Sequence, residues 1–167
     1  MTSYRQVFID TETTGLSAPK GDRIIEFAAI EAIDRQLTGR ILHFHFDPQR
    51  PIGAGATRVH GFTEGMLRGK PLFASIATEL LEFVRGAEVI MHNAVFDSGF
   101  IDAELERAGL HSRLSDVCKI TCTMQKARTK YPGESVGLDA LIERAHLGVV
   151  RGRHSALEDA RLLSRVY

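Results

Sequence analysis

The hydrophobic positions of the N-terminal third of the chain predict three strands. Residues 6–10 are apolar on both faces up to an acidic end, which is typical of a central strand covered on both sides. Two more strands are expected at residues 23–31 and 41–46, with connections short enough for antiparallel neighbours. We therefore expect the chain to begin as a three-strand antiparallel meander.

The rest of the chain alternates between helical and strand periodicity. Residues 48–70 hold two prolines and five glycines, which predicts an irregular segment with at most short helical turns. The expected later helices span residues 73–84, 94–108, 121–129, 135–147 and 156–166, and the expected later strands span residues 88–91 and 116–120. A meander followed by strand-helix units predicts an α/β fold, with a mixed five-stranded sheet flanked by helices.

The composition is that of one ordinary globular domain. The chain has 167 residues, of which 44% are hydrophobic and 25% are charged, and a chain of this length buries one sizeable core. We therefore expect a single domain over residues 1–167. Because 21 basic and 21 acidic residues leave no net charge, any attraction to a polyanion such as nucleic acid must be local.

The sequence shows no signal for export or for membrane insertion. The first ten residues lack an apolar stretch preceded by basic residues, and no run of about 18 apolar residues occurs. Cys118 and Cys122 are four residues apart, which is helical spacing and neither a CxxC pair nor a disulfide framework. We expect a cytoplasmic protein with reduced thiols and no membrane partner.

Asp10 and Glu12 are the first candidates for chemistry. They stand two residues apart at the end of the first predicted strand, where the period of two directs both carboxylates to the same side. Two neighbouring carboxylates repel each other when ionised, but they suit a divalent cation with hard oxygen ligands such as Mg²⁺. A pair of solvated acids at a strand end is the alternative, and for these two residues alone it is the more common situation.

Asp97 is the next candidate, at the start of a predicted helix. With Asn93 as the N-cap residue, Asp97 falls in the first turn, where the helix dipole favours an ionised carboxylate. Taken alone, Asp97 is more simply interpreted as a favourable first-turn acid.

The last predicted helix begins with a capping signal. Ser155 and Glu158 form the pattern S-x-x-E, which places Ser155 at the N-cap and Glu158 at N3. His154 and Asp159 then occupy positions N′ and N4, whose side chains meet across a helix start. We therefore expect His154 to lie outside the helix and near Asp159, as a base that can adjust when substrate arrives. An exposed histidine beside a helix-start acid is the alternative.

Taken together, these segments resemble the DEDDh family of 3′-to-5′ exonucleases. The resemblance is carried by residues 10–16 (DTETTGL), 92–97 (HNAVFD) and 154–159 (HSALED). Further similarity at residues 59–61, 85–88, 116–119 and 135–141 extends it over nearly the whole chain, and it is greatest to the proofreading (epsilon) subunits of bacterial DNA polymerase III. It implies an RNase H-like fold.

The resemblance also implies a role for each candidate residue. Four carboxylates would bind two divalent ions, Mg²⁺ or Mn²⁺, and His154 would be the general base. These carboxylates are Asp10, Glu12, Asp97 and Asp159. The terminal nucleotide would be held by Thr13, Leu16, Val59, His60, Asn93, Phe96 and His154. Leu16 and Phe96 could equally be core residues, and His60 could either stack on a base or be solvated.

We therefore expect a two-metal-dependent 3′-to-5′ exonuclease that releases nucleoside monophosphates from DNA 3′ ends and proofreads for a replicative DNA polymerase. The expected partners are a single-stranded or frayed DNA 3′ end and a DNA polymerase catalytic subunit. Two alternatives stay open, namely a stand-alone DEDDh enzyme that trims RNA or DNA 3′ ends, and a non-catalytic module that binds a polymerase. The end of the chain at Tyr167, directly after the last predicted helix, suits part of a longer subunit or a stand-alone enzyme.

Basic and histidine residues outside these motifs are weaker candidates. Arg151 and Arg153 adjoin His154 and are the preferred candidates for phosphate contacts, whereas the basic run at residues 126–130 is more typical of a solvated helix face. His43 and His45 share one face of a strand. We interpret both as structural, because no Cys or third His is placed to complete a zinc site.

Overall fold

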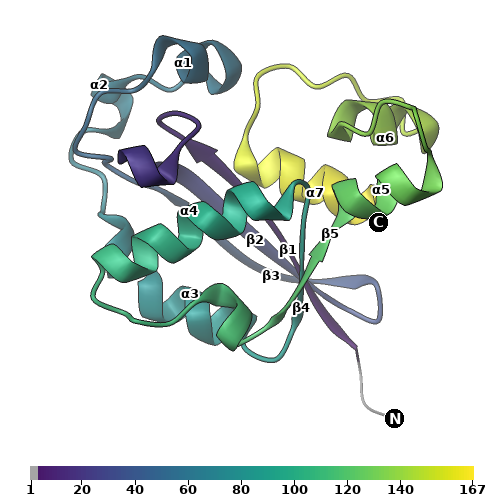
Figure 1. The fold of residues 1–167 in the computed structure, drawn as a ribbon, viewed down its shortest axis with the longest axis horizontal. Helices are drawn as coiled ribbons and strands as arrows, with labels where there is room; N and C mark the ends of the chain where they lie inside the picture. Colours follow the sequence, from purple (N-terminus) through teal and green to yellow (C-terminus); the bar gives the residue numbers. More distant parts are fainter. Residues whose placement is uncertain (1–3) are drawn as a thin grey trace.

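The structure, a computed structural model, describes residues 4–167 and is built around one five-stranded sheet (Figure 1). The strands are β1 (Arg5–Thr13), β2 (Ile24–Ile33), β3 (Gln36–His45), β4 (Glu88–Met91) and β5 (Lys119–Cys122). Their order is β3-β2-β1-β4-β5, with β1, β2 and β3 antiparallel and with β4 and β5 parallel to β1. The expected mixed sheet with an N-terminal meander is confirmed. The predicted domain also includes residues 1–3, which lie outside the described residues.

Helices cover both faces of this sheet. The α-helices are α1 (Ala54–His60), α2 (Glu64–Leu67), α3 (Ala77–Val84), α4 (Ala94–Arg107), α5 (Thr123–Lys130), α6 (Leu138–Arg144) and α7 (Ala156–Val166). Short 3₁₀ helices occur as η1 (Ala18–Lys20), η2 (Phe73–Ser75) and η3 (Leu114–Asp116). In Figure 1, α4 crosses one side of the sheet, and α7 lies along the strands on the other side.

Alternate side chains of β1 enter two different cores. Ile9 packs in a core with α3 and α4, whereas Phe8 packs in a core with α6 and α7. Because strand side chains alternate between faces, Asp10 and Glu12 point to the α7 side and Thr11 points to the α4 side. The pleat of β1 therefore distributes the residues at its end between two helices.

Small residues bring α7 close to the sheet. Ala28 of β2 packs with Ala156 and Ala160 of α7, and all three side chains are fully buried. Since an alanine side chain occupies little space, the first turn of α7 can approach the β2 backbone closely. This packing places the start of α7 beside the ends of β1 and β2.

The β2–β3 hairpin is longer than predicted. β3 begins at Gln36 rather than at residue 41, because Asp34 and Arg35 form a two-residue turn with positive φ angles of 48° and 67°. Such turns match the twist of the flanking strands and pair them up to the turn. Non-glycine residues at positive φ are uncommon, so the pattern of apolar positions could not reveal this turn.

Several other elements differ from their predicted bounds. β5 begins at Lys119 rather than at residue 116, because residues 114–116 form η3. The helix expected at residues 135–147 is restricted to α6, and the helix expected at residues 73–84 is divided into η2 and α3. The segment at residues 48–70 contains α1, which at seven residues is more regular than expected.

The two cysteines lie in different local structures. Cys118 and Cys122 are both free, although Cys122 ends β5 and the pair does not share a helix. Burial raises the pKa of the Cys118 thiol to about 11.

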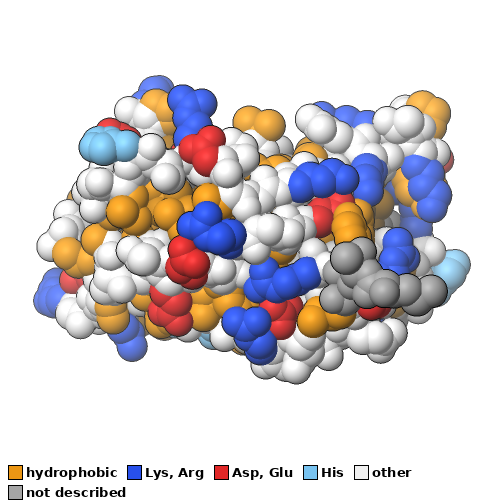
Figure 2. All heavy atoms as spheres, turned by 90° about the horizontal axis from the view of Figure 1, so that it is seen from below, with side chains coloured by type: hydrophobic (Ala, Val, Ile, Leu, Met, Phe, Trp, Pro, Cys, Tyr) orange, Lys and Arg blue, Asp and Glu red, His pale blue; other side chains and the backbone are white. Residues whose placement is uncertain are grey.

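Figure 2 shows basic and acidic side chains interspersed on the face that lies at the bottom of Figure 1. Within residues 4–167, no helix is long and apolar enough to cross a membrane.

A buried ion pair joins the sheet to α4. The guanidinium of Arg23 donates to both carboxylate oxygens of Glu104, at 2.7 and 2.9 Å. The backbone N–H of Ile24 donates to the same carboxylate at 3.2 Å, and Glu104 is only 1% exposed. This contact fixes α4, the helix that carries Asp97, against the start of β2.

Replacing Arg23 with methionine should lower the free energy of unfolding by about 2 kcal/mol or more, because the buried Glu104 carboxylate would lose both hydrogen bonds from Arg23 and keep only the more distant Arg107, at 3.6 Å, as a cation. Urea denaturation measures this change. The control is Arg85→Met, which removes a surface pair with Glu82 and should have little effect. Equal destabilisation in both variants would show that the buried pair does not hold α4 in place.

Candidate active site

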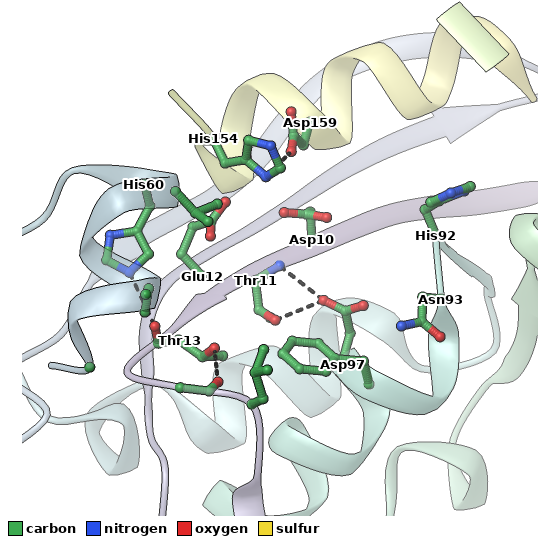
Figure 3. A pocket seen from close by; sticks show the side chains of 17 residues that line it. Asp10, Thr11, Glu12, Thr13, His60, His92, Asn93, Asp97, His154 and Asp159 are labelled. Atoms are coloured by element: carbon green, nitrogen blue, oxygen red, sulfur yellow. Dashed lines mark hydrogen bonds and ion pairs between the residues drawn. The ribbon is translucent and has the colours of Figure 1, made fainter. Parts of the chain in front are cut away.

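One cavity of about 530 Å³ brings together all the residues expected to act in catalysis, to bind metal or to hold the terminal nucleotide (Figure 3). It lies where the end of β1, the start of α4, helix α1 and the loop before α7 converge. The selected residues that line it are Asp10, Glu12, Thr13, Leu16, Val59, His60, Asn93, Phe96, Asp97, His154 and Asp159. The three motifs, far apart in sequence, thus form one site.

Three of the four carboxylates belong to the side of the sheet that α7 covers. Asp10 and Glu12 project from the end of β1, and Asp159 projects toward them from the first turn of α7. Glu12 and Asp159 are 7% and 4% exposed. Their ligand oxygens lie within 4.8 Å of each other, so Glu12 and Asp159 are close together with little water around them.

Asp97 approaches the same cavity from the opposite side of the sheet. It stands in the first turn of α4, is 3% exposed, and accepts two hydrogen bonds from Thr11. The donors are the backbone N–H at 3.1 Å and the side-chain hydroxyl at 2.7 Å. Because Thr11 stands between Asp10 and Glu12 in β1, one short segment orients all three acids.

The carboxylates resist ionisation in this environment. Burial, followed by repulsion from Asp159, Glu26 and Asp97, raises the pKa of Glu12 to about 8. Burial raises the pKa of Asp97 to about 7, although the hydrogen bonds from Thr11 partly oppose it. Burial and the neighbouring acids also hold the pKa values of Asp10 and Asp159 above their usual range. The cluster needs positive charge to be fully ionised at neutral pH.

Arg151 supplies some of that charge. Its guanidinium contacts Asp159 at 2.5 Å and Asp139 at 2.6 Å, and its side chain is 10% exposed. Arg151 was expected to contact a phosphate, but in the structure its guanidinium forms ion pairs with these two carboxylates. Arg153 is exposed, and its side chain lies against Gly61 at the C-terminal end of α1.

His154 lies outside α7, at the edge of the cavity. Its Nδ1 is 3.8 Å from Oδ2 of Asp159, and its side chain is 39% exposed. The backbone N–H of His154 donates to the carbonyl of Val59 at 3.1 Å, which connects this loop to α1. The imidazole is thus beside the acids and open to solvent, in the arrangement that the sequence predicts.

The predicted capping box at the start of α7 does not form. Ser155 occupies the N-cap position, but its hydroxyl donates to Oε1 of Glu26 at 3.1 Å. The backbone N–H of Ala156 donates to the other oxygen of Glu26 at 2.9 Å, while Glu158 is exposed. The prediction was wrong because a buried carboxylate from β2 binds the positive end of α7 in place of Glu158.

Asn93 occupies the predicted N-cap position of α4 without making the predicted capping bond. Its backbone is left-handed, with φ 68° and ψ 53°, and its side chain makes no hydrogen bond to the helix. A non-glycine residue in this conformation is strained, and such strain concentrates at functional sites. The neighbouring His92 also lines the cavity and was not selected from the sequence, although it begins the same motif.

The residues expected to hold a nucleotide differ in exposure. Leu16 is 87% exposed and Val59 is 43% exposed, so both offer apolar surface. Phe96 packs on Phe100 at 4.8 Å between ring centroids and also lines the cavity, so it belongs to both the core and the site. A core-only role for Leu16 is wrong.

His60 is buried and forms part of the scaffold. Its Nδ1 accepts the backbone N–H of Phe62 at 3.0 Å, so its Nε2 carries the proton and lies 3.2 Å from the carbonyl of Thr13. At 6% exposed, it is not the solvated histidine that the sequence left open. It connects α1 to the end of β1 and thereby shapes the cavity.

Gly15 is closely packed in the turn after β1, where a larger residue would have to displace Asp22. A Cβ atom at this position would lie 2.5 Å from a carboxylate oxygen of Asp22. That carboxylate accepts bonds from the hydroxyl of Thr14 and the backbone N–H of Ser17, at 2.9 and 3.1 Å. The turn that presents Leu16 to the cavity is therefore organised around Asp22.

Sequence comparisons identify close relatives. The chain is 42% identical over 170 residues to DNA polymerase III subunit epsilon of Pasteurella multocida, covering 98% of this chain and 66% of that protein. It is 39% identical over 169 residues to the same subunit of Escherichia coli K12, covering 98% of this chain and 70% of that protein. The chain thus spans about two thirds of the length of these relatives.

Structural comparisons agree with the sequence comparisons. Exonuclease X in complex with 5′ overhanging duplex DNA superposes with a TM-score of 0.73 at 26% identity, covering 96% of this chain and 87% of that chain. Exonuclease I of E. coli in complex with a dA16 oligonucleotide superposes with a TM-score of 0.79 at 22% identity, covering 96% and 39%. The expected RNase H-like fold is confirmed.

A family model provides the assignment. The model described as Exonuclease (RNase_T) matches residues 7–167, a range that includes every strand and helix described above except the first two residues of β1. The resemblance expected from the three motifs is confirmed, and the chain belongs to this exonuclease family.

Proposed function

We propose that this chain is a 3′-to-5′ exonuclease domain that releases nucleoside monophosphates from DNA 3′ ends. The observation that carries the proposal is the set of four carboxylates and one histidine around a single cavity. A volume of about 530 Å³ is within the range of small-molecule sites, roughly 300–1,000 Å³. It suits the end of a strand better than a continuous duplex.

The donor set of the cavity suits two divalent ions, Mg²⁺ or Mn²⁺. Carboxylate oxygens are the ligands that these hard cations prefer, and Asp10, Glu12, Asp97 and Asp159 would hold them. Burial raises the pKa values of Glu12 and Asp97 although Arg151 lies beside the cluster, so bound cations would favour full ionisation of these acids. Two such ions would promote attack by water and offset the charge that develops on the leaving 3′ oxygen.

His154 is the proposed general base. It is exposed enough to meet a water molecule entering the cavity, and Asp159 lies near enough to orient its ring. Its position in a loop, rather than in α7, allows the imidazole to adjust when the substrate binds. His154 would accept the proton that the attacking water loses.

The remaining cavity residues would hold the terminal nucleotide. Leu16, Val59 and Phe96 offer apolar surface for the base and sugar, and Asn93 offers an amide for hydrogen bonds. Thr13 shapes the end of β1, because its hydroxyl donates to the carbonyl of Gly15 at 2.6 Å. Arg153, which is exposed next to His154, is the proposed contact for a backbone phosphate.

Proofreading for a DNA polymerase is the proposed context of this activity. The relatives are subunits of DNA polymerase III, so the proposed partner is a polymerase catalytic subunit and the proposed location is the cytoplasm. A purely structural module would not need four acids whose burial raises their pKa values. The arrangement therefore favours catalysis over a non-catalytic role.

End-labelled oligonucleotides test the proposed function. Metal-free protein supplied with Mg²⁺ or Mn²⁺ should convert 5′-labelled DNA into a ladder of shortened products and should release the label of 3′-labelled DNA as a mononucleotide. A primer with a mispaired 3′ end should be shortened faster than a matched primer, because its end is already frayed. Faster hydrolysis of RNA of the same sequence would favour an RNA-trimming enzyme. Release of the 5′ nucleotide first would contradict the proposal.

Replacing His154 with glutamine should lower turnover by ~10²–10⁴, the typical contribution of a general base. The increase in melting temperature caused by Mg²⁺ should remain, because the carboxylates are unchanged. The control is His111→Gln, which removes an imidazole that is 81% exposed and outside the cavity. Wild-type turnover in His154→Gln would remove this residue from the proposed mechanism.

Replacing Asp97 with asparagine should abolish hydrolysis and most of the stabilisation by Mg²⁺. A ligand that binds only the folded protein stabilises it by RT ln(1 + [L]/Kd), about 2.7 kcal/mol at a hundredfold excess over Kd. Differential scanning calorimetry with and without Mg²⁺ measures this effect. The control on the same helix is Glu106→Gln, whose side chain is 67% exposed. An equal shift in Asp97→Asn and wild type would place the metal elsewhere.

A further inference from the structure

A second group of metal-ligating side chains lies on the sheet, outside the cavity. Glu26 of β2 and His43 and His45 of β3 offer ligand atoms that all lie within 4.8 Å of one another. Nε2 of His43 is 2.8 Å from Oε1 of Glu26, and Nε2 of His45 is 3.6 Å from the same oxygen. Two imidazoles from one strand thus converge on one carboxylate oxygen.

Strand pairing brings these three residues together. His43 and His45 are two residues apart in β3, so their side chains share a face of the sheet. Glu26 is the register partner of His45, and Ala28 is the partner of His43. Because Ala28 has a small side chain, the imidazole of His43 can reach across to Glu26.

We propose that Glu26, His43 and His45 form a binding site for one divalent transition-metal ion of the zinc class. Two imidazoles and one carboxylate are a common ligand set for Zn²⁺, with a fourth position left for water. Imidazole ligands also favour Zn²⁺ and Co²⁺ over Mg²⁺. The side chains of Glu26, His43 and His45 would have to move slightly to bind the ion, since the bonds from Zn²⁺ to its ligands are about 2.0–2.2 Å long.

The carboxylate of Glu26 is buried and held in a fixed orientation by hydrogen bonds. It is 1% exposed, and it accepts hydrogen bonds from the hydroxyl of Ser155 and the backbone N–H of Ala156. Such outer contacts orient carboxylate ligands in metal sites. Binding of an ion would replace the contact between His43 and Oε1, while the bond from Ala156 to Oε2 could remain. The site would therefore stay connected to the start of α7.

The two histidines are accessible to an ion from solvent. They stand on β3, an edge strand, with side chains 29% and 32% exposed. Their rings are 4.9 Å apart between centroids, and Phe62 packs on His45 at 5.2 Å. A purely structural hydrogen bond accounts for the position of His43, but it does not account for a second imidazole directed at the same oxygen. The interpretation of both histidines as structural considered only a Cys or a third His as the completing ligand, and not a carboxylate from the neighbouring strand.

Cobalt binding tests the site, because four-coordinate Co²⁺ with imidazole ligands absorbs visible light. The untagged protein should carry Asp10→Asn and Asp159→Asn, which remove two of the four proposed ligands of the catalytic ions and weaken Co²⁺ binding there. Titration of this metal-free protein should give a saturable visible spectrum at one equivalent, and Zn²⁺ should abolish the spectrum by displacement. Absence of saturable binding would overturn the proposal.

A further substitution identifies the ligands. Adding His45→Phe to the same protein removes one imidazole but keeps an aromatic side chain against Phe62, and the Co²⁺ spectrum should be lost. The matched addition of His111→Phe should leave the spectrum unchanged. If His45→Phe fails to fold, NMR of the parent protein should show Zn²⁺ shifting the imidazole signals of His43 and His45. A spectrum that persists in folded His45→Phe, or signals unmoved by Zn²⁺, would refute the assignment.

Discussion

Repulsion among buried carboxylates is the constraint on which the rest of this structure depends. Four acids surround one cavity, and burial raises the pKa of each. The fold holds these acids in place against their mutual repulsion. Thr11 fixes Asp97, Arg151 fixes Asp159, and the pleat of β1 fixes the remaining two. The fold thus holds together four acids that need added positive charge to ionise fully, and divalent cations would supply that charge.

Glu26 connects this cluster to the rest of the sheet. It binds the first turn of α7, contacts two histidines of β3, and pairs in register with Glu12. Because α7 begins at this carboxylate, the positions of His154 and Asp159 depend on β2 as well as on their own loop. A metal ion bound to Glu26 would therefore act on the same helix start that forms part of the proposed active site.

Features encoded within short segments could be predicted from the sequence, whereas features that depend on distant partners could not. The pleat that aligns Asp10 with Glu12 is local, and the position of His154 before α7 is also local. The cap of α7 could not be predicted, because Glu26 lies 129 residues away from Ser155. Arg151 was assigned to phosphate because Asp139, which binds it, becomes its neighbour only through folding. In both cases a carboxylate from another part of the chain took precedence over the local pattern.

The pH dependence of stability in metal-free protein tests the account most directly. The folded-state pKa values of Glu12 and Asp97 are about 8 and about 7, above the ordinary values of 4.5 and 3.8. The free energy of unfolding should therefore fall as the pH rises from about 4 to about 8, because the folded protein retains protons that the unfolded chain has released. Comparison with Glu12→Gln/Asp97→Asn isolates this contribution, since the histidines are common to both proteins. On this account, wild type should lose stability relative to the variant over this range, and saturating Mg²⁺ should reverse the loss. An unchanged stability difference between pH 5 and pH 8 would contradict it.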